Sequence, residues 1–562
     1  MFRVRPSWLQ FLFSPLCFTG ESISLHKAKE DAMQNEMNQQ KSCLGWIAGV
    51  FLGGVVLTRL RLLGLPLERD EGEYAYMAQQ WLQGVLPYAE THSMKFPGIY
   101  FMYASVLALL GQNPSSIHLS LLFVNLATAF LLYRLGSKWW NSSAGIVAGV
   151  SYSILTLSPA LQGVWANAEH FVLIFVLAGI LLLKGAQGQR LFYSGCLLGC
   201  ALLIKQHALF FCLFGGVYLG ARIITRRESL KNLILNMGVF VAGGATPMMF
   251  VVLLYWVTGN FSDFWFCTIQ YASEYVSMTS PSQGFANFKY NFATILESNF
   301  SVLWLSLIGM ASVAWKTDVR REYLFLFGFF IFSFLAITPG LYFRPHYFLL
   351  WMPAFSLFAG VGFASLPDKF ASFRVKTIVP VGILILILGL PIWIQKNAFF
   401  TLPAFTVTRQ VYGLNPFSAS LEVAQYINEH SNKEDQIAIL GSEPQILFYA
   451  QRKSATRHIY MYPLMEKHVY ARSMQAEMIR EIEGAQPKFI VEVKLFGSWV
   501  SSRPDLEPLL KDWAQAYLSR NYFVSGVVDV LSHEETVYKW GEQARDYSPQ
   551  SSFHLVIYQR LT

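Results

Sequence analysis

Long apolar runs, separated by short segments that carry the charge, are the feature that most constrains the fold of this chain. Only 14% of its 562 residues are charged and 54% are hydrophobic, whereas a soluble globular protein has about 25% charged residues. A helix needs about 20 consecutive apolar residues to cross the hydrocarbon core of a bilayer. The pattern therefore predicts an α-helical membrane protein that crosses the bilayer many times.

We expect about eleven membrane-spanning helices, and up to thirteen if shorter runs also cross. The expected spans lie near residues 44–66, 115–136, 143–160, 168–184, 191–205, 207–224, 233–257, 299–316, 322–340, 345–366 and 375–395. The run 97–111 has about 15 residues, a length that suits a re-entrant or interfacial helix better than a span.

The distribution of basic residues predicts how these helices are oriented. If 97–111 does not cross, the loops on the side of the N-terminus contain Arg134, Lys138, Lys184, Arg190, Arg222, Arg226, Arg227, Lys231, Lys316, Arg320, Arg321, Lys369, Arg374 and Lys376. The opposite side has half as many, namely Arg59, Arg61, Arg69, Lys95, Lys205, Lys289 and Arg344. Because cytoplasmic loops are enriched in Lys and Arg, we expect a multi-pass protein of the plasma (inner) membrane with its N-terminus inside.

Composition changes near residue 396, which predicts three parts. These are a cytoplasmic N-terminal tail (1–43), a transmembrane domain (44–396) with outer loops 67–114 and 258–298, and a small extracytoplasmic α/β domain (397–562). In the last part we expect helices at 421–430 and 465–483 and strands at 436–440, 488–493 and 553–559. The tail has a short apolar stretch without a clean cleavage motif, and Met33 or Met37 is an equally good start.

Several classes of function are not supported by the sequence. The net charge of +8 comes from basic residues between apolar runs, without the interleaved basic and aromatic residues of a nucleic-acid surface. Neither a Walker loop nor a GxGxxG fingerprint occurs, so we expect no nucleotide. Cys196 and Cys200 lie one helical turn apart, but free cysteines are commonly buried packing residues, and we expect no disulfide framework.

Acidic residues at the ends of apolar runs are the first candidates for a functional site. Asp70 and Glu71 follow the first run, and Glu169 opens a later one. A carboxylate at a membrane surface can act as a general base on a hydroxyl, or can bind a cation. The alternative is that each is a solvated residue in the first turn of a helix, where the helix dipole favours negative charge.

Basic residues on the same expected face are the second group. Lys95 precedes Pro97, and Arg344, His346 and Tyr347 lie together in an aromatic segment. An ammonium or a guanidinium at this surface is suited to binding a phosphate. The alternative is that they are ordinary interfacial anchors. Carboxylates for a hydroxyl and cations for a phosphate are together what transfer from a phosphorylated lipid requires.

Four further residues are weaker candidates. Arg59 and Arg61 lie late in the first apolar run, where they either extend to the outer interface or point into the site. Tyr74 follows the acidic pair in an expected helix, and His170 adjoins Glu169. A histidine in this position is more often interfacial than a ligand, and the sequence identifies no metal site.

The outer-loop motifs resemble those of a known family. The residues that carry the resemblance are Asp70-Glu71, Tyr74, Ala78, Gly84, Pro87-Tyr88, Lys95-Phe96-Pro97, Tyr100, Glu169, Arg344-Pro345-His346-Tyr347 and Pro353. Together they resemble GT-C glycosyltransferases, and among these the aminoarabinose transferases and protein O-mannosyltransferases. The resemblance covers most of residues 44–366. Two departures are the glutamate at 169, where the family commonly has aspartate, and Phe96-Pro97-Gly98 in place of a double proline after the lysine.

The resemblance implies a GT-C fold and a glycosyltransferase, either hexosyl or pentosyl. Such an enzyme moves a sugar from a polyprenyl-phosphate donor to a lipid, protein or glycan acceptor at the outer face, with inversion. Asp70 would be the base or would orient the acceptor, Glu71 would assist it, and Glu169 would be the second acid. Lys95, Arg344, His346 and Tyr347 would bind the donor phosphate. The implied partners are the donor, the acceptor and membrane lipids, and a divalent cation stays open as a cofactor.

Two other classes of function stay open at this point. A transporter or flippase of lipid-linked sugars would also place charges in a membrane protein. Such proteins often contain inverted repeats and broken helices near the midplane, and the sequence shows no convincing repeat. A scaffold that binds a partner through the C-terminal domain would leave both outer clusters unexplained.

Overall fold

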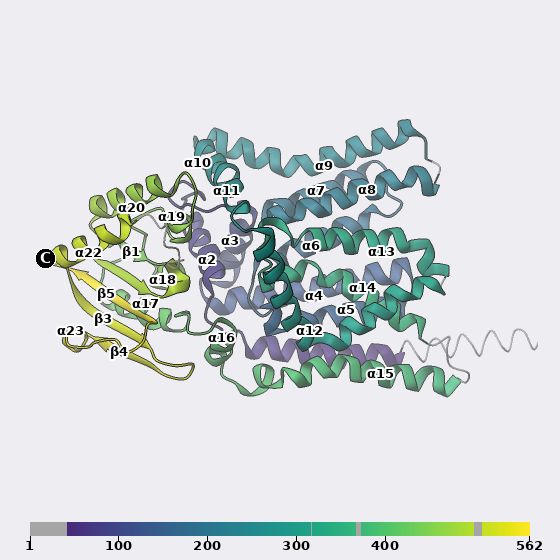
Figure 1. The fold of residues 1–562 in the computed structure, drawn as a ribbon. Coiled ribbons are helices and arrows are strands. Elements are labelled where there is room, and N and C mark those ends of the chain that lie inside the picture. Colours follow the sequence, from purple (N-terminus) through teal and green to yellow (C-terminus); the bar gives the residue numbers. More distant parts are fainter. Residues whose placement is uncertain (1–41, 227, 316, 367–372, 500–507, 562) are drawn as a thin grey trace, which may run out of the picture.

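The computed structural model describes residues 42–562, except 227, 316, 367–372, 500–507 and 562. A bundle of helices forms most of the molecule, and a small sheet with its own helices covers one end of the bundle (Figure 1). All but the last two residues of the predicted N-terminal tail lie outside the described residues.

Apolar helices form the bundle. Four of those in the described part of the chain are long and apolar enough to cross a membrane: Ser42–Arg61, Pro114–Trp139, Leu230–Val257 and Pro281–Ala314. Seven shorter apolar helices accompany them: Gly98–Leu110, Ser142–Leu155, Ala168–Leu183, Gln189–Ile204, Glu322–Leu335, Met352–Ser365 and Ile378–Ile394. The helical membrane class is confirmed, while the number of about eleven spans stays a prediction.

The elements of the bundle follow one another with short connections. After Ser42–Arg61 they are α2 (Arg69–Leu82), α3 (Gly98–Leu110), α4 (Pro114–Trp139), α5 (Ser142–Leu155), η1 (Pro159–Leu161), α6 (Ala168–Leu183), α7 (Gln189–Ile204), η2 (Gln206–Ala208), α8 (Leu209–Arg226), α9 (Leu230–Val257), α10 (Phe261–Trp265), η3 (Phe266–Tyr271), α11 (Ala272–Val276), α12 (Pro281–Ala311), η4 (Ser312–Ala314), α13 (Thr317–Leu335), η5 (Pro339–Leu341), η6 (Pro345–Leu350), α14 (Met352–Ser365) and α15 (Phe373–Ile394). At about 1.5 Å per residue, α3 is about 20 Å long, which is shorter than the hydrocarbon core of about 30 Å.

Small residues allow the helices of the bundle to approach closely. A Cβ atom on Gly309 of α12 would overlap the carbonyl oxygen of Phe358 on α14, and one on Gly362 of α14 would overlap that of Leu305 on α12. Helix association inside a membrane depends on such close packing, because lipid is as apolar as the helix surfaces. The crossing of α12 and α14 therefore requires glycine at both positions.

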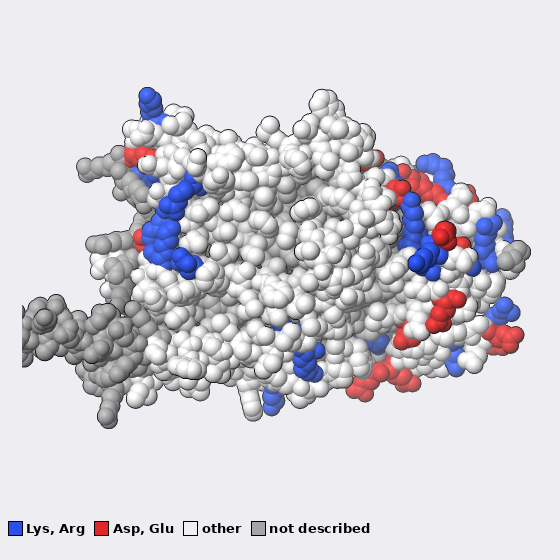
Figure 2. All heavy atoms as spheres, turned by 180° about the vertical axis from the view of Figure 1, so that it is seen from behind, with Lys and Arg blue, Asp and Glu red and all other residues white. Residues whose placement is uncertain are grey.

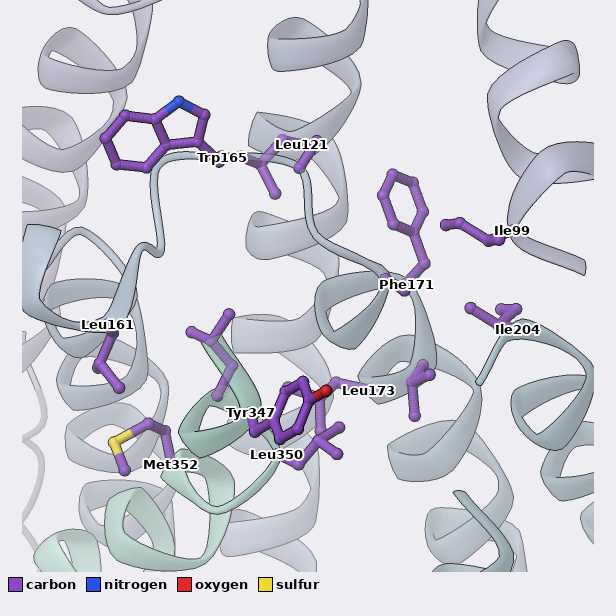
Figure 3. Packing of buried hydrophobic residues seen from close by; sticks show 14 of the residues in the cluster. Ile99, Leu121, Leu161, Trp165, Phe171, Leu173, Ile204, Tyr347, Leu350 and Met352 are labelled. Atoms are coloured by element: carbon purple, nitrogen blue, oxygen red, sulfur yellow. The ribbon is translucent and has the colours of Figure 1, made fainter. Parts of the chain in front are cut away.

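Apolar side chains fill the half of the bundle nearer the sheet domain, where several helices begin or end. Figure 3 shows Phe171 of α6 beside Ile99 of α3 and Ile204 at the end of α7, and Tyr347 beside Leu350. All of them are buried. This packing fixes the positions of α3, α6, α7 and η6, whose ends nearest the sheet domain carry the polar residues described below.

A five-stranded mixed sheet forms the centre of the C-terminal part. Its strands are β1 (Ile437–Leu440), β2 (Phe489–Lys494), β3 (Tyr522–Val530), β4 (Thr536–Trp540) and β5 (His554–Arg560), in the order β1-β2-β5-β3-β4. β1 pairs with β2 in parallel, and the other pairs are antiparallel. The other elements are η8 (Asn397–Thr401), α16 (Ala404–Tyr412), α17 (Ala419–Glu429), α18 (Gln445–Ala450), α19 (Tyr462–Met465), α20 (Ala471–Ala485), α21 (Phe496–Trp499), α22 (Leu509–Asn521) and α23 (Glu542–Arg545).

The sequence predicted part of this architecture. The expected strands at 436–440, 488–493 and 553–559 are confirmed within one residue as β1, β2 and β5. β3 and β4 were not expected. The helix expected to begin at 465 begins instead at Ala471, because α19 ends at Met465 and the backbone of Glu466 is extended.

α2 connects the bundle to the C-terminal part. The Arg69 guanidinium lies 2.8 Å from the buried carboxylate of Glu443, and the backbone N–H of Ser454 donates a hydrogen bond of 2.9 Å to the hydroxyl of Tyr76. Gly72 faces the backbone of Gln445 so closely that a Cβ there would overlap it. The bundle and the sheet domain therefore share a packed junction at α2.

Candidate active site

The two acids that open α2 point to different surroundings. The side chain of Glu68 caps the helix by accepting a hydrogen bond of 2.9 Å from the N–H of Glu71, whose carboxylate accepts one of 3.2 Å from the N–H of Glu68. Glu71 is fully buried, accepts a hydrogen bond of 2.5 Å from the N–H of Ala166 and lies 3.1 Å from Nε2 of His118. Glu71 thus holds α2 against α4 and the segment before α6, whereas Asp70 faces a cavity.

Asp70 lies at the centre of a group of charges. Lys95 Nζ is 3.1 Å from Oδ1 of Asp70, and the hydroxyl of Tyr460 donates a hydrogen bond of 3.1 Å to the same oxygen. Nε2 of His346 is 3.9 Å from Oδ2 of Asp70. Burial alone would raise the pKa of the Asp70 carboxyl, but Lys95 and Arg344 outweigh it and hold that pKa well below its usual range. Asp70 is therefore ionised and a weak proton acceptor.

Lys95 is held by a second carboxylate that the sequence analysis did not single out. Glu73 Oε2 lies 2.5 Å from Nζ of Lys95, and Glu73 also accepts a hydrogen bond of 2.8 Å from the hydroxyl of Tyr100. The ring of Tyr74 lies under the ammonium at 4.6 Å. Residues three apart share one face of a helix, so the spacing of Asp70 and Glu73 could have indicated that both face Lys95.

Glu169 forms a second ion pair beside the cavity. Its carboxylate pairs with Lys205, which follows α7, and His346 Nε2 lies 4.0 Å from its Oε1. Nδ1 of His346 is 2.8 Å from the side-chain oxygen of Gln162. The ammonium of Lys205 lies 4.2 Å above the ring of Tyr347. We expected Lys205 only as one of the basic residues of the outer side. It could have been singled out as a site residue because it interrupts two apolar runs.

Arg344 is a cation of the cavity wall without a carboxylate partner among the described residues. Its Nη2 lies 3.4 Å from the hydroxyl of Tyr275, and its guanidinium lies 5.7 Å from the ring centroid of Tyr342. Asp70, Lys95, Lys205, Arg344 and Tyr347 all line the same cavity. The structure therefore brings together the acidic first loop and the distant basic-aromatic segment.

The C-terminal part completes the cavity. Tyr460, Tyr462, Pro463 and Met474 line it opposite the residues of the bundle. Tyr460 contacts Asp70 although 390 positions separate them in the chain. No local sequence signal marks these residues, because their role depends on how the sheet domain packs on α2.

The remaining candidates lie outside the cavity lining. Arg59 is buried and donates hydrogen bonds of 2.9 and 3.2 Å to the carbonyls of Thr156 and Gly163. Arg61 donates one of 3.1 Å to the carbonyl of Phe399. His170 is fully buried, and neither of its ring nitrogens has a hydrogen-bond partner among the described residues. In this structure both arginines bind backbone carbonyls of neighbouring segments.

One further polar group lies beside the cavity. His92, His458 and Glu477 place their ligand atoms within 4.8 Å of one another, and they are the one such group of His, Cys, Asp or Glu found among the described residues. These three residues could hold a metal ion. None of them was a candidate from the sequence, since one lies in the first outer loop and two lie in the C-terminal part.

Comparison with known proteins supports the fold. Neither the protein-family models nor the curated proteins give a match to the sequence. The crystal structure of ArnT from Cupriavidus metallidurans bound to undecaprenyl phosphate matches with a TM-score of 0.58 at 14% identity, over 92% of this chain and 98% of that chain. This chain has the GT-C fold. ArnT without ligand matches with a TM-score of 0.57, also at 14% identity and with the same coverage of both chains.

A second GT-C structure matches less closely. The archaeal oligosaccharyltransferase AglB from Archaeoglobus fulgidus, in complex with an inhibitory peptide and a dolichol-phosphate, has a TM-score of 0.50 at 11% identity. The match covers 90% of this chain and 75% of AglB. The GT-C fold expected from the outer-loop motifs is thus confirmed. At these identities the comparison supports the fold alone, so the roles of individual residues depend on the geometry of the cavity.

Proposed function

We propose that this protein is a membrane glycosyltransferase that transfers a sugar from a polyprenyl-phosphate donor to a lipid, protein or glycan acceptor. One observation carries the proposal. Asp70, Lys95, Lys205 and Arg344 line one cavity, and Glu169 pairs with Lys205 beside it. The fold agrees with it, since the ArnT structure contains undecaprenyl phosphate and the AglB structure contains a dolichol-phosphate.

The donor phosphate would bind at the cationic wall of the cavity. Lys95 and Lys205 already pair with carboxylates, whereas Arg344 has no such partner among the described residues. A guanidinium can bind a phosphate through two parallel hydrogen bonds. We therefore assign the first phosphate contact to Arg344, with Lys95, His346 and Tyr347 beside it.

The transfer itself is a displacement at the anomeric carbon. The acceptor oxygen or nitrogen forms a bond to that carbon from the side opposite the phosphate, while the bond between the carbon and the phosphate oxygen breaks. The polyprenyl phosphate leaves with the bonding electrons. The configuration at the anomeric carbon inverts because the acceptor attacks from the side opposite the phosphate. Its added negative charge is met by Arg344 and Lys95.

Asp70 would orient the acceptor in this reaction. As a carboxylate of low pKa, Asp70 accepts a hydrogen bond from the attacking group more readily than it keeps a proton. The departing phosphate monoester has a second pKa of about 6. It is therefore more basic than the Asp70 carboxylate and takes the acceptor's proton at the end of the reaction. Glu169 and Lys205 would hold His346 beside both reactants, and Glu71 would hold α2 in place.

We further infer that the cavity faces the extracytoplasmic side of the plasma membrane, together with the C-terminal domain (397–562). On the face drawn in Figure 2, few Lys or Arg residues lie on the middle of the molecule, a basic cluster lies at the end away from the sheet domain, and the sheet domain carries residues of both signs. Basic residues favour the cytoplasmic side. The 44–396 part would then be the membrane domain, with the cavity at its outer end.

The test is an assay on the purified full-length protein in liposomes, with a radiolabelled polyprenyl-phosphate sugar as donor. Transfer to an acceptor and movement of the intact donor across the bilayer are scored separately. Transfer that requires Asp70 would support the proposal. Translocation of intact donor without transfer would instead identify the alternative, a transporter or flippase, and would overturn it.

Asp70→Asn is the decisive variant in this assay. It should lower transfer by about 10²- to 10³-fold, the usual cost of removing one preorganised polar group from a reaction site. Glu90→Gln is the matched control, because Glu90 is an exposed carboxylate near the same loop that pairs only with Lys453 at the surface. Equal activity of Asp70→Asn and Glu90→Gln would contradict the assignment.

A further inference from the structure

The backbone just before Arg344 has a conformation that is unusual for its residues. Gly340, Leu341 and Phe343 have positive φ angles of 72°, 55° and 44°. Glycine enters this left-handed region freely, whereas a leucine or phenylalanine is strained there because its Cβ atom crowds the backbone. Such strain persists only where the surrounding structure holds the chain in place, and it is concentrated at functional sites. The segment therefore needs partners that stabilise it.

Two asparagines of α12 are those partners. Nδ2 of Asn291 donates a hydrogen bond of 3.1 Å to the carbonyl of Phe343, and Nδ2 of Asn287 donates one of 3.4 Å to the carbonyl of Leu341. Residues four apart lie on the same face of a helix, so α12 presents both amides to the segment together. The two carbonyls belong to the two strained residues that are not glycine, so the amides act where the strain lies.

The aromatic rings of the segment are held by two different elements. Phe343 is buried, and its ring centroid lies 5.2 Å from that of Phe288 on α12. The ring of Tyr342 stacks on that of Tyr275 on α11, with centroids 4.6 Å apart and planes at 15°. Consecutive residues thus reach α12 and α11, and the segment is fixed between these helices.

This arrangement determines where the Arg344 guanidinium lies. Nη2 of Arg344 is 3.4 Å from the hydroxyl of Tyr275, and Arg344 lines the cavity. Its own backbone is extended, with φ of −59° and ψ of 148°, as expected for a residue that precedes a proline. Because Phe343 directly precedes it, a change of φ at Phe343 would swing the guanidinium away from its present position.

We propose that Asn287 and Asn291 are positioning residues for Arg344. By binding the carbonyls of Leu341 and Phe343, they hold the left-handed backbone that directs the guanidinium toward the donor phosphate. Neither asparagine is among the described residues that line the cavity, so both act through the backbone of the segment. The inference rests on the proposed function, because it explains how the phosphate contact of that reaction is set.

The test measures binding of a short isoprenyl monophosphate to the purified full-length protein in detergent, by calorimetric titration. Asn287→Ala and Asn291→Ala should each raise the Kd of this probe by about three- to tenfold, the usual worth of one hydrogen bond. In the transfer assay they should raise KM for the donor and leave KM for the acceptor unchanged. Both asparagines are only partly buried, so the alanine variants should fold.

Thr294→Ala is the matched control for these variants. Thr294 is an exposed residue of α12, and its hydroxyl bonds only to a carbonyl of the same helix. Its replacement should leave both the Kd of the probe and KM for the donor unchanged. Probe binding that is as tight in both asparagine variants as in this control overturns the inference, and so does an equal rise in KM for donor and acceptor.

Replacing Leu341 separates positioning from a general loss of structure. In the Asn287→Ala background, Leu341→Gly removes the steric cost of the left-handed conformation, so the Kd of the probe should return toward the wild-type value. Leu341→Ala removes most of the same side chain but keeps that cost, so it should give no recovery. Equal binding by the two double variants would contradict a role that acts through the backbone.

The wild-type protein distinguishes failure of this inference from failure of the proposed function. Wild-type protein that binds the probe but transfers no sugar contradicts the proposed function, while the comparison of variants still tests the inference. Wild-type protein that transfers sugar, with both asparagine variants binding the probe equally well, overturns the inference alone. Wild-type protein that does not bind the probe overturns the assignment of the phosphate to Arg344 and the inference with it.

Discussion

At the scale of single residues, two neighbouring acids of α2 face different surroundings. Asp70 and Glu71 are neighbours with the same functional group, yet Asp70 contacts Lys95 and Tyr460 at the cavity while Glu71 contacts His118 and a backbone N–H in the interior. Successive residues of a helix point about 100° apart. Asp70 therefore faces the cavity, and its role there stays a prediction. Glu71 is fully buried, so the alternative of a solvated residue in the first turn is wrong for Glu71.

Removing the charge of Lys95 should make transfer sensitive to acid. The pKa of Asp70 lies well below its ordinary value of 3.8 in the folded protein, so its stabilising charge is present above that value and is lost only as the pH falls far below it. Burial favours the neutral form of Asp70, and in Lys95→Met less positive charge is left to counteract this effect. The pKa of Asp70 should therefore rise in the variant. The measurement is the pH dependence of kcat/KM, whose acid limb should move to higher pH in the variant and stay in place in Lys453→Met, a surface control.

Replacing Arg344 should weaken donor use more than acceptor use. Arg344→Gln removes the cation assigned to the phosphate, and we expect a loss of about 10²- to 10³-fold in kcat/KM for the donor. Arg344→Lys should recover only part of it, because an ammonium cannot bind a phosphate through the two parallel hydrogen bonds of a guanidinium. Steady-state kinetics with each substrate varied in turn check this, and an equal effect on donor and acceptor would assign Arg344 a general structural role.

At the scale of elements, close helix crossings at glycine hold the bundle together. Gly309 on α12 and Gly362 on α14 face backbone atoms of the opposite helix with no space for a side chain. α14 follows directly on η6, the short helix that contains His346 and Tyr347. The position of this part of the cavity wall thus depends on a helix contact at the far end of α14.

Gly309→Val should separate α12 from α14. Overpacking a close contact costs about 1–3 kcal/mol, so the Tm in detergent should fall and transfer should decrease with it. Gly389→Val on α15 is the matched control, since a Cβ at that glycine meets no atom within 4 Å. A similar loss of stability in both variants would indicate an effect of valine on the helices themselves instead of on the crossing.

At the scale of the whole molecule, the cavity exists only where two parts of the chain pack together. The Arg69–Glu443 ion pair crosses this junction at 2.8 Å, with Glu443 fully buried and Arg69 nearly so. Nη1 of Arg69 also donates a hydrogen bond of 2.7 Å to the hydroxyl of Tyr462, a residue of the cavity lining. The junction thus couples the docking of the sheet domain to the shape of the site.

Glu443→Gln should loosen this junction. It removes the negative charge beside the largely buried guanidinium of Arg69, and loss of one partner of a buried ion pair typically costs about 3–5 kcal/mol. We expect faster hydrogen exchange in α2 and α18, a lower Tm and reduced transfer. The control is Glu434→Gln, at an exposed position of the same domain, which should leave the hydrogen exchange, the Tm and transfer unchanged. If Glu443→Gln also leaves the hydrogen exchange of α2 unchanged, the ion pair does not hold the junction.

The sequence by itself determined the properties that depend on local patterns. Apolar runs and scarce charge determined the helical membrane class, because a bilayer accepts only segments that satisfy their own backbone hydrogen bonds. Short, mostly apolar runs indicated three of the five strands. The outer-loop motifs indicated the GT-C fold and named Asp70, Lys95 and Arg344, because a reactive group at a membrane surface interrupts an otherwise apolar pattern.

Only the tertiary structure decided which of these groups act together. It separated Asp70 from Glu71, paired Lys205 with Glu169, and brought Tyr460 across 390 positions to Asp70. It also assembled His92, His458 and Glu477 from three segments. The physical reason is that such contacts follow from how helices cross and how the sheet domain packs on α2, and neither helical periodicity nor motif spacing carries information over those distances.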